Sequence, residues 1–168
     1  MVRVVPPTHP TGERESLETW LDFHRETLLI KCDGLDAESL AVASCPPSGL
    51  SLMGLVRHLA DVESWFHAWD DEPDGDLFAD EDMWVADPAL VERDLASYRA
   101  SVERSRRAAA AHDLDDVIQL SHWVGDDRPR EVLPTSLRWI YQHMIEEYAR
   151  HNGHADLVRE LIDGSTGE

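Results

Sequence analysis

Residues 135–164 read TSLRWIYQHMIEEYARHNGHADLVRELIDG, and this stretch decides the fold class. Its apolar residues recur at the spacing of a buried helix face. The proline at position 134 and Gly164 are typical of residues that bound a helix. The pattern therefore predicts a long helix over about 135–163, with an apolar stripe made of Leu137, Ile140, Met144, Val158 and Ile162.

Two polar residues interrupt this apolar stripe in its middle. Steps of three and four from Met144 reach Glu147 and then His151, before Ala155 and Val158 resume the stripe. Residues four apart are neighbours on one helix face, so the carboxylate and the imidazole lie side by side. An ionised Glu facing a bundle core is unfavourable unless another group compensates it. We therefore expect a compensating partner inside the fold.

Three further amphipathic segments precede this helix. Apolar spacing and capping residues predict helices over about 14–32, 51–69 and 88–111, with Ser51 and Asp87 as N-terminal caps. A length of 168 residues is typical of one domain. Four amphipathic helices without a convincing sheet predict an all-α, single-domain protein, either an antiparallel or a crossover four-helix bundle.

Two segments between these helices lack a helical pattern. Residues 70–82 are acidic and contain Pro73 and Gly75, which predicts a solvated surface loop without the ligand spacing of a calcium loop. Residues 113–134 are harder to interpret, because the apolar run at 117–120 fits either a short strand or an irregular loop.

The second predicted helix offers a partner for the polar pair. His58 falls between Leu55 and Val62 on its inner face. Two imidazoles and one carboxylate from two facing helices form a common three-ligand metal site with open positions for water or substrate. A bound cation is the simplest single explanation for His58, Glu147 and His151. From spacing alone, a metal-free pair in which Glu147 and His151 hydrogen-bond to each other also stays open.

The other histidines compete less well for this role. His143 lies one turn before Glu147, but the helix rotation between His143 and His151 keeps them from pointing equally well at one ion. His154 is next to His151 but is not aligned with Glu147 on the helix face. Whether His143 or His154 contributes to the site stays open. Glu146 is expected to face solvent. His24 is expected in the core or a pocket wall, and His67, His112 and His122 are expected on the surface or in loops.

Composition excludes several function classes. With 15 basic and 34 acidic residues the formal charge is −19, which argues against nucleic acid and against an anionic membrane surface. No apolar run approaches the length of a membrane span. Two cysteines, Cys32 and Cys45, are too few for a disulfide scaffold, so we expect a cytoplasmic protein with reduced thiols. Gly-rich phosphate loops, nucleophile elbows and the His-Glu-x-x-His motif are missing from the sequence.

Two motifs resemble a known family. LMGLVRHLA at 52–60 looks like the second-helix motif of the DinB-like (damage-inducible protein B, YfiT-like) metal-binding superfamily. SLRW at 136–139, followed by HMIEEYARHNGH at 143–154, is similar to the fourth-helix motif of the branch found in mycothiol-using bacteria. The likeness extends from about Thr19 to Gly164.

The resemblance implies a four-helix bundle in which a second-helix His and a fourth-helix pair hold a divalent metal. Matched residue by residue, these ligands are His58, Glu147 and His151. Many family members have His in place of Glu147, whereas the mycothiol-dependent maleylpyruvate isomerases have Glu.

Three functions follow as hypotheses. The first is a cytoplasmic metalloenzyme that activates a small thiol, with mycothiol as cosubstrate. The activated thiol either is transferred to a small electrophile or promotes its isomerisation. Zinc is the expected metal, with nickel, manganese and iron as alternatives. The second is a non-catalytic metal-binding or stress-response protein, and the third a metal-free helical interaction module. The substrate, a catalytic base beyond the ligands and homodimerisation stay open.

Overall fold

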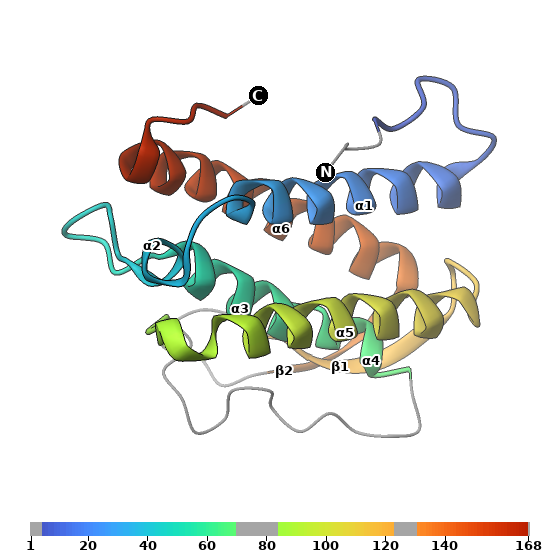
Figure 1. The fold of residues 1–168 in the computed structure, drawn as a ribbon. Coiled ribbons are helices and arrows are strands. Elements are labelled where there is room, and N and C mark those ends of the chain that lie inside the picture. Colours follow the sequence, from blue (N-terminus) through green and yellow to red (C-terminus); the bar gives the residue numbers. More distant parts are fainter. Residues whose placement is uncertain (1–4, 70–83, 123–130, 168) are drawn as a thin grey trace.

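The computed structural model describes residues 5–69, 84–122 and 131–167. This part of the chain is mostly helical and contains one antiparallel pair of strands, which is compatible with the predicted all-α class (Figure 1). The elements in chain order are α1 (Glu13–Cys32), α2 (Ala37–Ala41), α3 (Leu52–Val62), α4 (Ser64–His67), η1 (Pro88–Leu90), α5 (Val91–Ala110), β1 (Val117–His122), β2 (Glu131–Ser136) and α6 (Leu137–Asp163).

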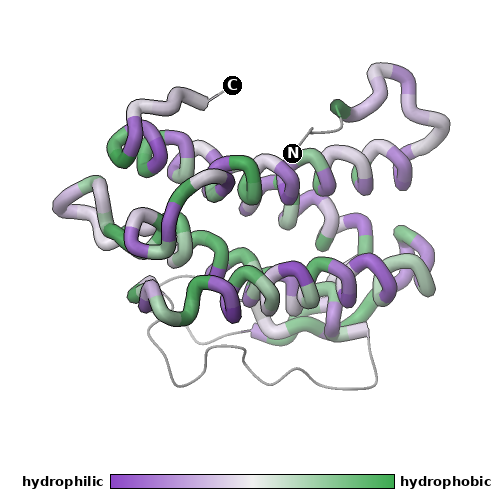
Figure 2. The backbone as a smooth tube through the Cα atoms, viewed as in Figure 1, coloured by the Kyte–Doolittle hydropathy of each residue, from purple (hydrophilic) through white to green (hydrophobic). Residues whose placement is uncertain are grey.

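The four long helices pack in pairs. α1 packs along α6, α3 packs along α5, and α3 also contacts α6 across the middle (Figure 1). Hydrophobic residues run along α3, whereas α1 and α5 alternate between hydrophobic and hydrophilic residues (Figure 2). α3 is therefore the helix with the least solvent contact, as its almost wholly buried sequence requires. The core shared by these helices includes Leu21, Leu28, Leu55, Leu59, Tyr98, Ile140, Met144 and Tyr148.

The single helix predicted over 51–69 is wrong, because the structure divides it at Glu63 into α3 and α4. The Glu63 carbonyl accepts bonds from the Phe66 amide, 3.0 Å away, and from the Ser105 hydroxyl, 3.1 Å away. An i to i+3 bond and an inserted hydroxyl replace the regular helical ladder at this carbonyl. Sequence periodicity did not reveal the break, because the buried face continues through it.

The last helix starts close to where the sequence predicts it, at Thr135 or Ser136, because Ser136 is its N-terminal cap. Thr135 and Ser136 belong to β2, and α6 begins at Leu137, with the Ser136 side chain accepting a bond from the Trp139 amide. β2 pairs antiparallel with β1, with Val117 opposite Ser136 at one end and His122 opposite Glu131 at the other. The apolar run at 117–120, for which the sequence allows a strand or a loop, is thus part of a strand, while residues 123–130 lie outside the described part of the chain. Because the strand pairs with only one neighbour, the proline in β2 is tolerated.

The helix predicted over 88–111 starts with the single turn η1 and continues as α5 to Ala110. The Asp87 side chain accepts a bond from the Ala89 amide, as a capping residue should. The short helix α2 was not predicted, although Asp36 caps it in the same way through the Ser39 amide. The predicted acidic loop at 70–82 lies outside the described residues. No described helix is long and apolar enough to cross a membrane.

Candidate metal centre

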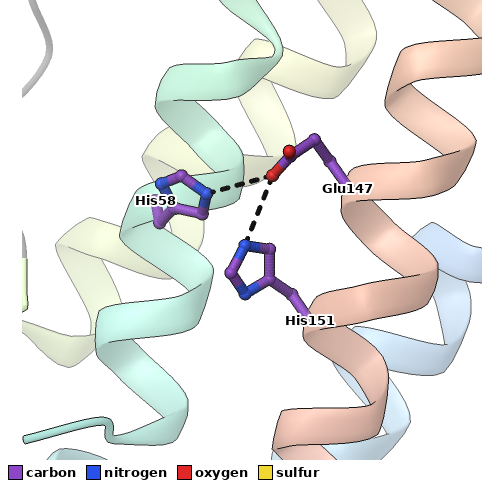
Figure 3. A group of neighbouring side chains, drawn as sticks. All are labelled: His58, Glu147 and His151. Carbon is purple, nitrogen blue, oxygen red and sulfur yellow. Dashed lines mark hydrogen bonds and ion pairs between the residues drawn. The ribbon is translucent and has the colours of Figure 1, made fainter. Parts of the chain in front are cut away.

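His58, Glu147 and His151 meet where α3 faces α6 (Figure 3). The Nε2 atom of His58 lies 3.4 Å from Oε2 of Glu147, and Nε2 of His151 lies 3.3 Å from the same oxygen. The two imidazole rings are edge to face, with centroids 4.5 Å apart. Two elements distant in sequence therefore bring three atoms that could ligate a metal within 4.8 Å of one another.

These separations fit a divalent cation. Metal–nitrogen and metal–oxygen bonds of about 2.1 Å in a tetrahedral arrangement place two ligand atoms roughly 3.4 Å apart. The observed 3.4 and 3.3 Å separations are of this size. The donor set of two imidazoles and one carboxylate suits zinc, nickel, iron and manganese.

Burial and charge at the site also suit a cation. The side chains of His58, Glu147 and His151 are 20%, 13% and 10% exposed, so the cluster is largely but not fully covered. Hydrogen bonds from His151 and then His58 hold the pKa of Glu147 well below its ordinary value, against the opposing effect of burial. Arg150 adds to this effect, with Nη1 3.2 Å from Oε1 of Glu147. The carboxylate is therefore ionised at neutral pH and offers a negative ligand atom.

A buried ion pair holds α6 in register with α3 beside the cluster. Tyr148, the residue after Glu147, donates a 2.6 Å hydrogen bond to Oε1 of Glu63. Arg25 of α1 contacts both Glu63 oxygens, with Nη2 2.6 Å from Oε2. Burial opposes ionisation of Glu63, but the charge and hydrogen bonds of Arg25, together with hydrogen bonds from Ser105 and Tyr148, hold the pKa of Glu63 below its ordinary value. Because Tyr148 is anchored here, the neighbouring Glu147 is turned toward His58.

A second anchor lies on the far side of the pair. Asn152, the residue after His151, donates a 3.0 Å hydrogen bond to the carbonyl of His24 on α1. The His24 ring is half-buried and contacts the rings of Trp20 and Phe23 on the same helix. The two candidate ligands of α6 are thus each followed by a residue that fixes the rotation of the helix.

Trp84 forms one wall of the cluster and was not found by sequence reasoning. Its indole stacks on the His58 ring, with centroids 5.0 Å apart and planes 29° from parallel. Arg57 of α3 donates a 2.7 Å hydrogen bond to the Val85 carbonyl, and a Cβ added at Gly54 would lie 3.0 Å from the Trp84 carbonyl oxygen. No sequence signal marks this contact, because it depends on a close approach between backbones distant in sequence.

The neighbouring histidines take different positions. His154 lies against the other side of His151, with 3.3 Å between the two Nδ1 atoms, and not against Glu147. His143 contributes to a second group of potential ligand atoms with Glu146 and Glu147, again within 4.8 Å of one another. Glu146 is exposed, in agreement with the predicted solvent-facing position, and it pairs with Arg150.

The surface position predicted for His67 is wrong. Its ring is buried, with Nε2 3.0 Å from the Ser101 carbonyl and 3.1 Å from the Ser105 hydroxyl. Two hydrogen-bonding partners on α5 make burial of this imidazole favourable. His112 is partly exposed and lies 3.4 Å from Asp116. His122 lies in β1, but its side chain is outside the described part of the structure.

The two cysteines have different surroundings. Cys32 is buried and Cys45 is partly exposed. Burial raises the pKa of Cys32 to about 12, so its thiol stays protonated at neutral pH. Cys32 is therefore an inert core residue rather than a nucleophile.

Comparison with known proteins adds one match. A family model described as mycothiol-S-transferase matches residues 16–164, a span that contains His58, Glu147 and His151. Neither the curated proteins nor the solved structures that were searched contain a match.

Proposed function

This chain belongs to the mycothiol-S-transferase family, and from that premise we propose that it is a metal-dependent enzyme that joins mycothiol, through its sulfur, to a small electrophile. The family confirms the resemblance to the mycothiol-related branch of the DinB-like superfamily. The observation that carries the proposal is the convergence of His58, Glu147 and His151 on one point between α3 and α6.

The proposal assigns these three residues as ligands of one divalent metal inside a four-helix bundle of α1, α3, α5 and α6. Zinc is the proposed metal, because imidazole and carboxylate ligands with an open position are typical of catalytic zinc. Nickel, manganese and iron accept the same ligands, so metal analysis decides among them. The proposal is supported by separations near 3.4 Å and by the ionised state of Glu147.

The bound cation would supply one chemical effect, which is to favour the thiolate form of a coordinated thiol. The thiol would release its proton to solvent, and the sulfur electron pair of the thiolate would form the new bond to the electrophilic carbon. In a substitution the leaving group departs with its bonding pair, and in an addition to a double bond the neighbouring carbon gains a proton. Cys32 cannot replace the external thiol, because its own thiol is buried and protonated.

Contacts within the chain hold the proposed ligands in position for this chemistry. Glu147 presents Oε2 to both imidazoles, while its other oxygen is held by Arg150. Trp84 covers one face of His58 and keeps water from that side of the ring. Preorganised ligands of this kind lose little entropy when the metal and thiol bind.

The first experiment is elemental analysis of protein purified without an immobilised-metal column or chelator, followed by assay with mycothiol and 1-chloro-2,4-dinitrobenzene. We expect about one metal per chain and a metal-dependent S-conjugate detected by mass spectrometry. His58→Ala and His151→Ala should lose both, whereas His112→Ala, which removes a histidine away from the site, should keep both.

The same experiment separates the alternatives. Stoichiometric metal with no turnover across a panel of thiols and electrophiles would favour a non-catalytic metal-binding or stress-response protein. No metal after incubation with zinc, nickel or manganese would contradict the metal centre and leave a helical interaction module. A cytoplasmic location stays a prediction from the sequence, and homodimerisation stays open.

A further inference from the structure

Three aromatic rings stack beside the candidate metal centre. Trp65 of α4 and Trp139 of α6 are nearly parallel, with centroids 5.5 Å apart and planes 19° from parallel. The His143 ring stacks on Trp139 at 4.8 Å and lies 4.6 Å from Trp65. We call these three side chains the aromatic cluster. Its outermost ring, Trp139, remains 39% exposed, so part of the cluster is open to a ligand.

The aromatic cluster begins at the edge of the metal centre. His143 lies one helical turn before Glu147, and its ligand nitrogen is within 4.8 Å of a Glu147 carboxylate oxygen. Trp139 lies one further turn along the same helix. A path of stacked rings therefore leads from the proposed metal ligands along α6 toward the strands.

A hollow lies at the other end of this path. Its volume is about 330 Å³, which is enough for a small molecule. The lining comes from β1, β2 and the first turn of α6, and consists of Val117, Leu133, Pro134, Thr135, Ser136 and Trp139. None of these side chains is charged.

The lining distinguishes this hollow from another one described in the structure. A hollow of about 220 Å³ is lined by four charged side chains, Glu18, Asp22, Arg25 and Arg106. The other four lining residues are uncharged, but the charged half of the lining favours polar or ionic contents. An uncharged, largely apolar lining with an exposed indole favours the flat face of an aromatic ring.

We propose that the hollow and Trp139 together bind the electrophilic substrate, and that the preferred electrophiles carry an aromatic ring. This inference rests on the proposed function, since it names the second substrate of that reaction. The aromatic ring stacks on Trp139 and fills the hollow, while the reactive group extends past His143 toward the thiol over the two helical turns, about 12 Å, between Trp139 and Glu147. The formal charge of −19 on the protein further favours a neutral substrate over an anionic one.

The test uses unreactive ligands, so that binding is measured apart from catalysis. N-phenylsuccinimide, N-cyclohexylsuccinimide and N-ethylsuccinimide share one polar ring and differ only in the attached group. Ligand-observed NMR titration of the full chain gives the dissociation constant of each. We expect the phenyl compound to bind about tenfold more tightly than the ethyl compound, with the cyclohexyl compound between them.

Variants locate the binding. Trp139→Ala should raise the dissociation constant of N-phenylsuccinimide about tenfold and leave that of N-ethylsuccinimide nearly unchanged. Trp20→Ala is the matched control, because Trp20 is similarly exposed at 45% but lies on α1. Leu133→Asp provides a second test in case Trp139→Ala misfolds, since it places a charge in the hollow without removing an aromatic ring. Circular dichroism confirms that each variant is folded.

The outcomes separate this inference from the proposed function. Equal affinity for the phenyl and ethyl compounds, or unchanged phenyl binding in folded Trp139→Ala and Leu133→Asp, overturns the aromatic site even if mycothiol transfer is observed. Selective phenyl binding lost in these variants supports the site. If the same preparation then forms no mycothiol conjugate with any aromatic electrophile, the binding site stands and the proposed reaction is contradicted.

Discussion

The indole of Trp84 stacks on the imidazole of His58, with ring centroids 5.0 Å apart. The same indole lies 6.4 Å from the ring of His151, so one side chain covers parts of two proposed ligands. The stack restrains the rotation of His58 and shields it from water. A proposed metal ligand on α3 is thus oriented by a residue that the sequence pattern did not single out.

Replacing Trp84 with Ala should weaken metal binding. Loss of an aromatic pair worth about 1 kcal/mol should raise the dissociation constant for zinc roughly fivefold. Competition with a chromophoric zinc chelator measures this constant. Trp84→Phe keeps a ring over His58 and should bind zinc nearly as the unmodified protein does. Identical affinity in the Ala and unmodified proteins would show that the stack does not orient the ligand.

Gly54→Ala should destabilise the protein, although alanine is the better helix former. Its new Cβ would lie 3.0 Å from the Trp84 carbonyl oxygen, and the backbone there would have to move. We expect a loss of about 1 kcal/mol in the free energy of unfolding, measured by urea denaturation.

Gly153→Ala is the matched control for this change. It also lies within a helix, but an added Cβ there would meet nothing within 4 Å. It should stabilise the protein by up to about 1 kcal/mol through helix propensity alone. Equal effects of the two substitutions would contradict the close approach at Gly54.

Glu63→Gln should destabilise the protein strongly at neutral pH. The change removes the buried negative partner of Arg25 and leaves it only the partly exposed Asp22, 3.0 Å away; breaking a buried pair in this way typically costs about 3–5 kcal/mol. Glu103→Gln, a change at an exposed carboxylate on α5, should alter stability by no more than about 0.5 kcal/mol.

The Glu63 effect should depend on pH in a defined direction. The Arg25 contact keeps the pKa of folded Glu63 below its ordinary value of 4.5, so the unfolded chain takes up this proton first. The stabilisation is therefore complete above the unfolded pKa and is lost as pH falls through the lower folded pKa. When the free energies of unfolding of the unmodified protein and Glu63→Gln are measured from pH 7 to pH 3, the difference between them should shrink below about pH 4.5. A constant difference would show that Glu63 does not act through its charge.

Zinc should raise the thermal stability of the protein through the candidate centre. At free zinc one hundred times the dissociation constant, binding adds about 2.7 kcal/mol, which corresponds to a rise in Tm of roughly 5–10 °C. EDTA should reverse the rise, and His151→Ala should show none. An equal zinc-dependent rise in His151→Ala would place the bound metal elsewhere.

Part of the architecture followed from local patterns in the sequence. Helical spacing and capping residues predicted the positions of the long helices, because the buried face of a helix leaves a period in the sequence. The same period put Glu147 and His151 on one face of α6, where the structure places them. The pairing of this face with His58 came from family motifs as well, since spacing within a helix does not specify which helix lies opposite.

The tertiary structure decided the features that depend on contacts between distant segments. The break at Glu63 follows from Ser105 on another helix, and the burial of His67 from hydrogen-bonding groups on that same helix. The Trp84 wall and the stacking of Trp65 on Trp139 likewise join residues separated along the chain. The sequence by itself determined which residues share a helix face, because that relation is local. Only packing of the whole chain determined what each face meets, because that depends on the combined burial and hydrogen bonding of all the elements.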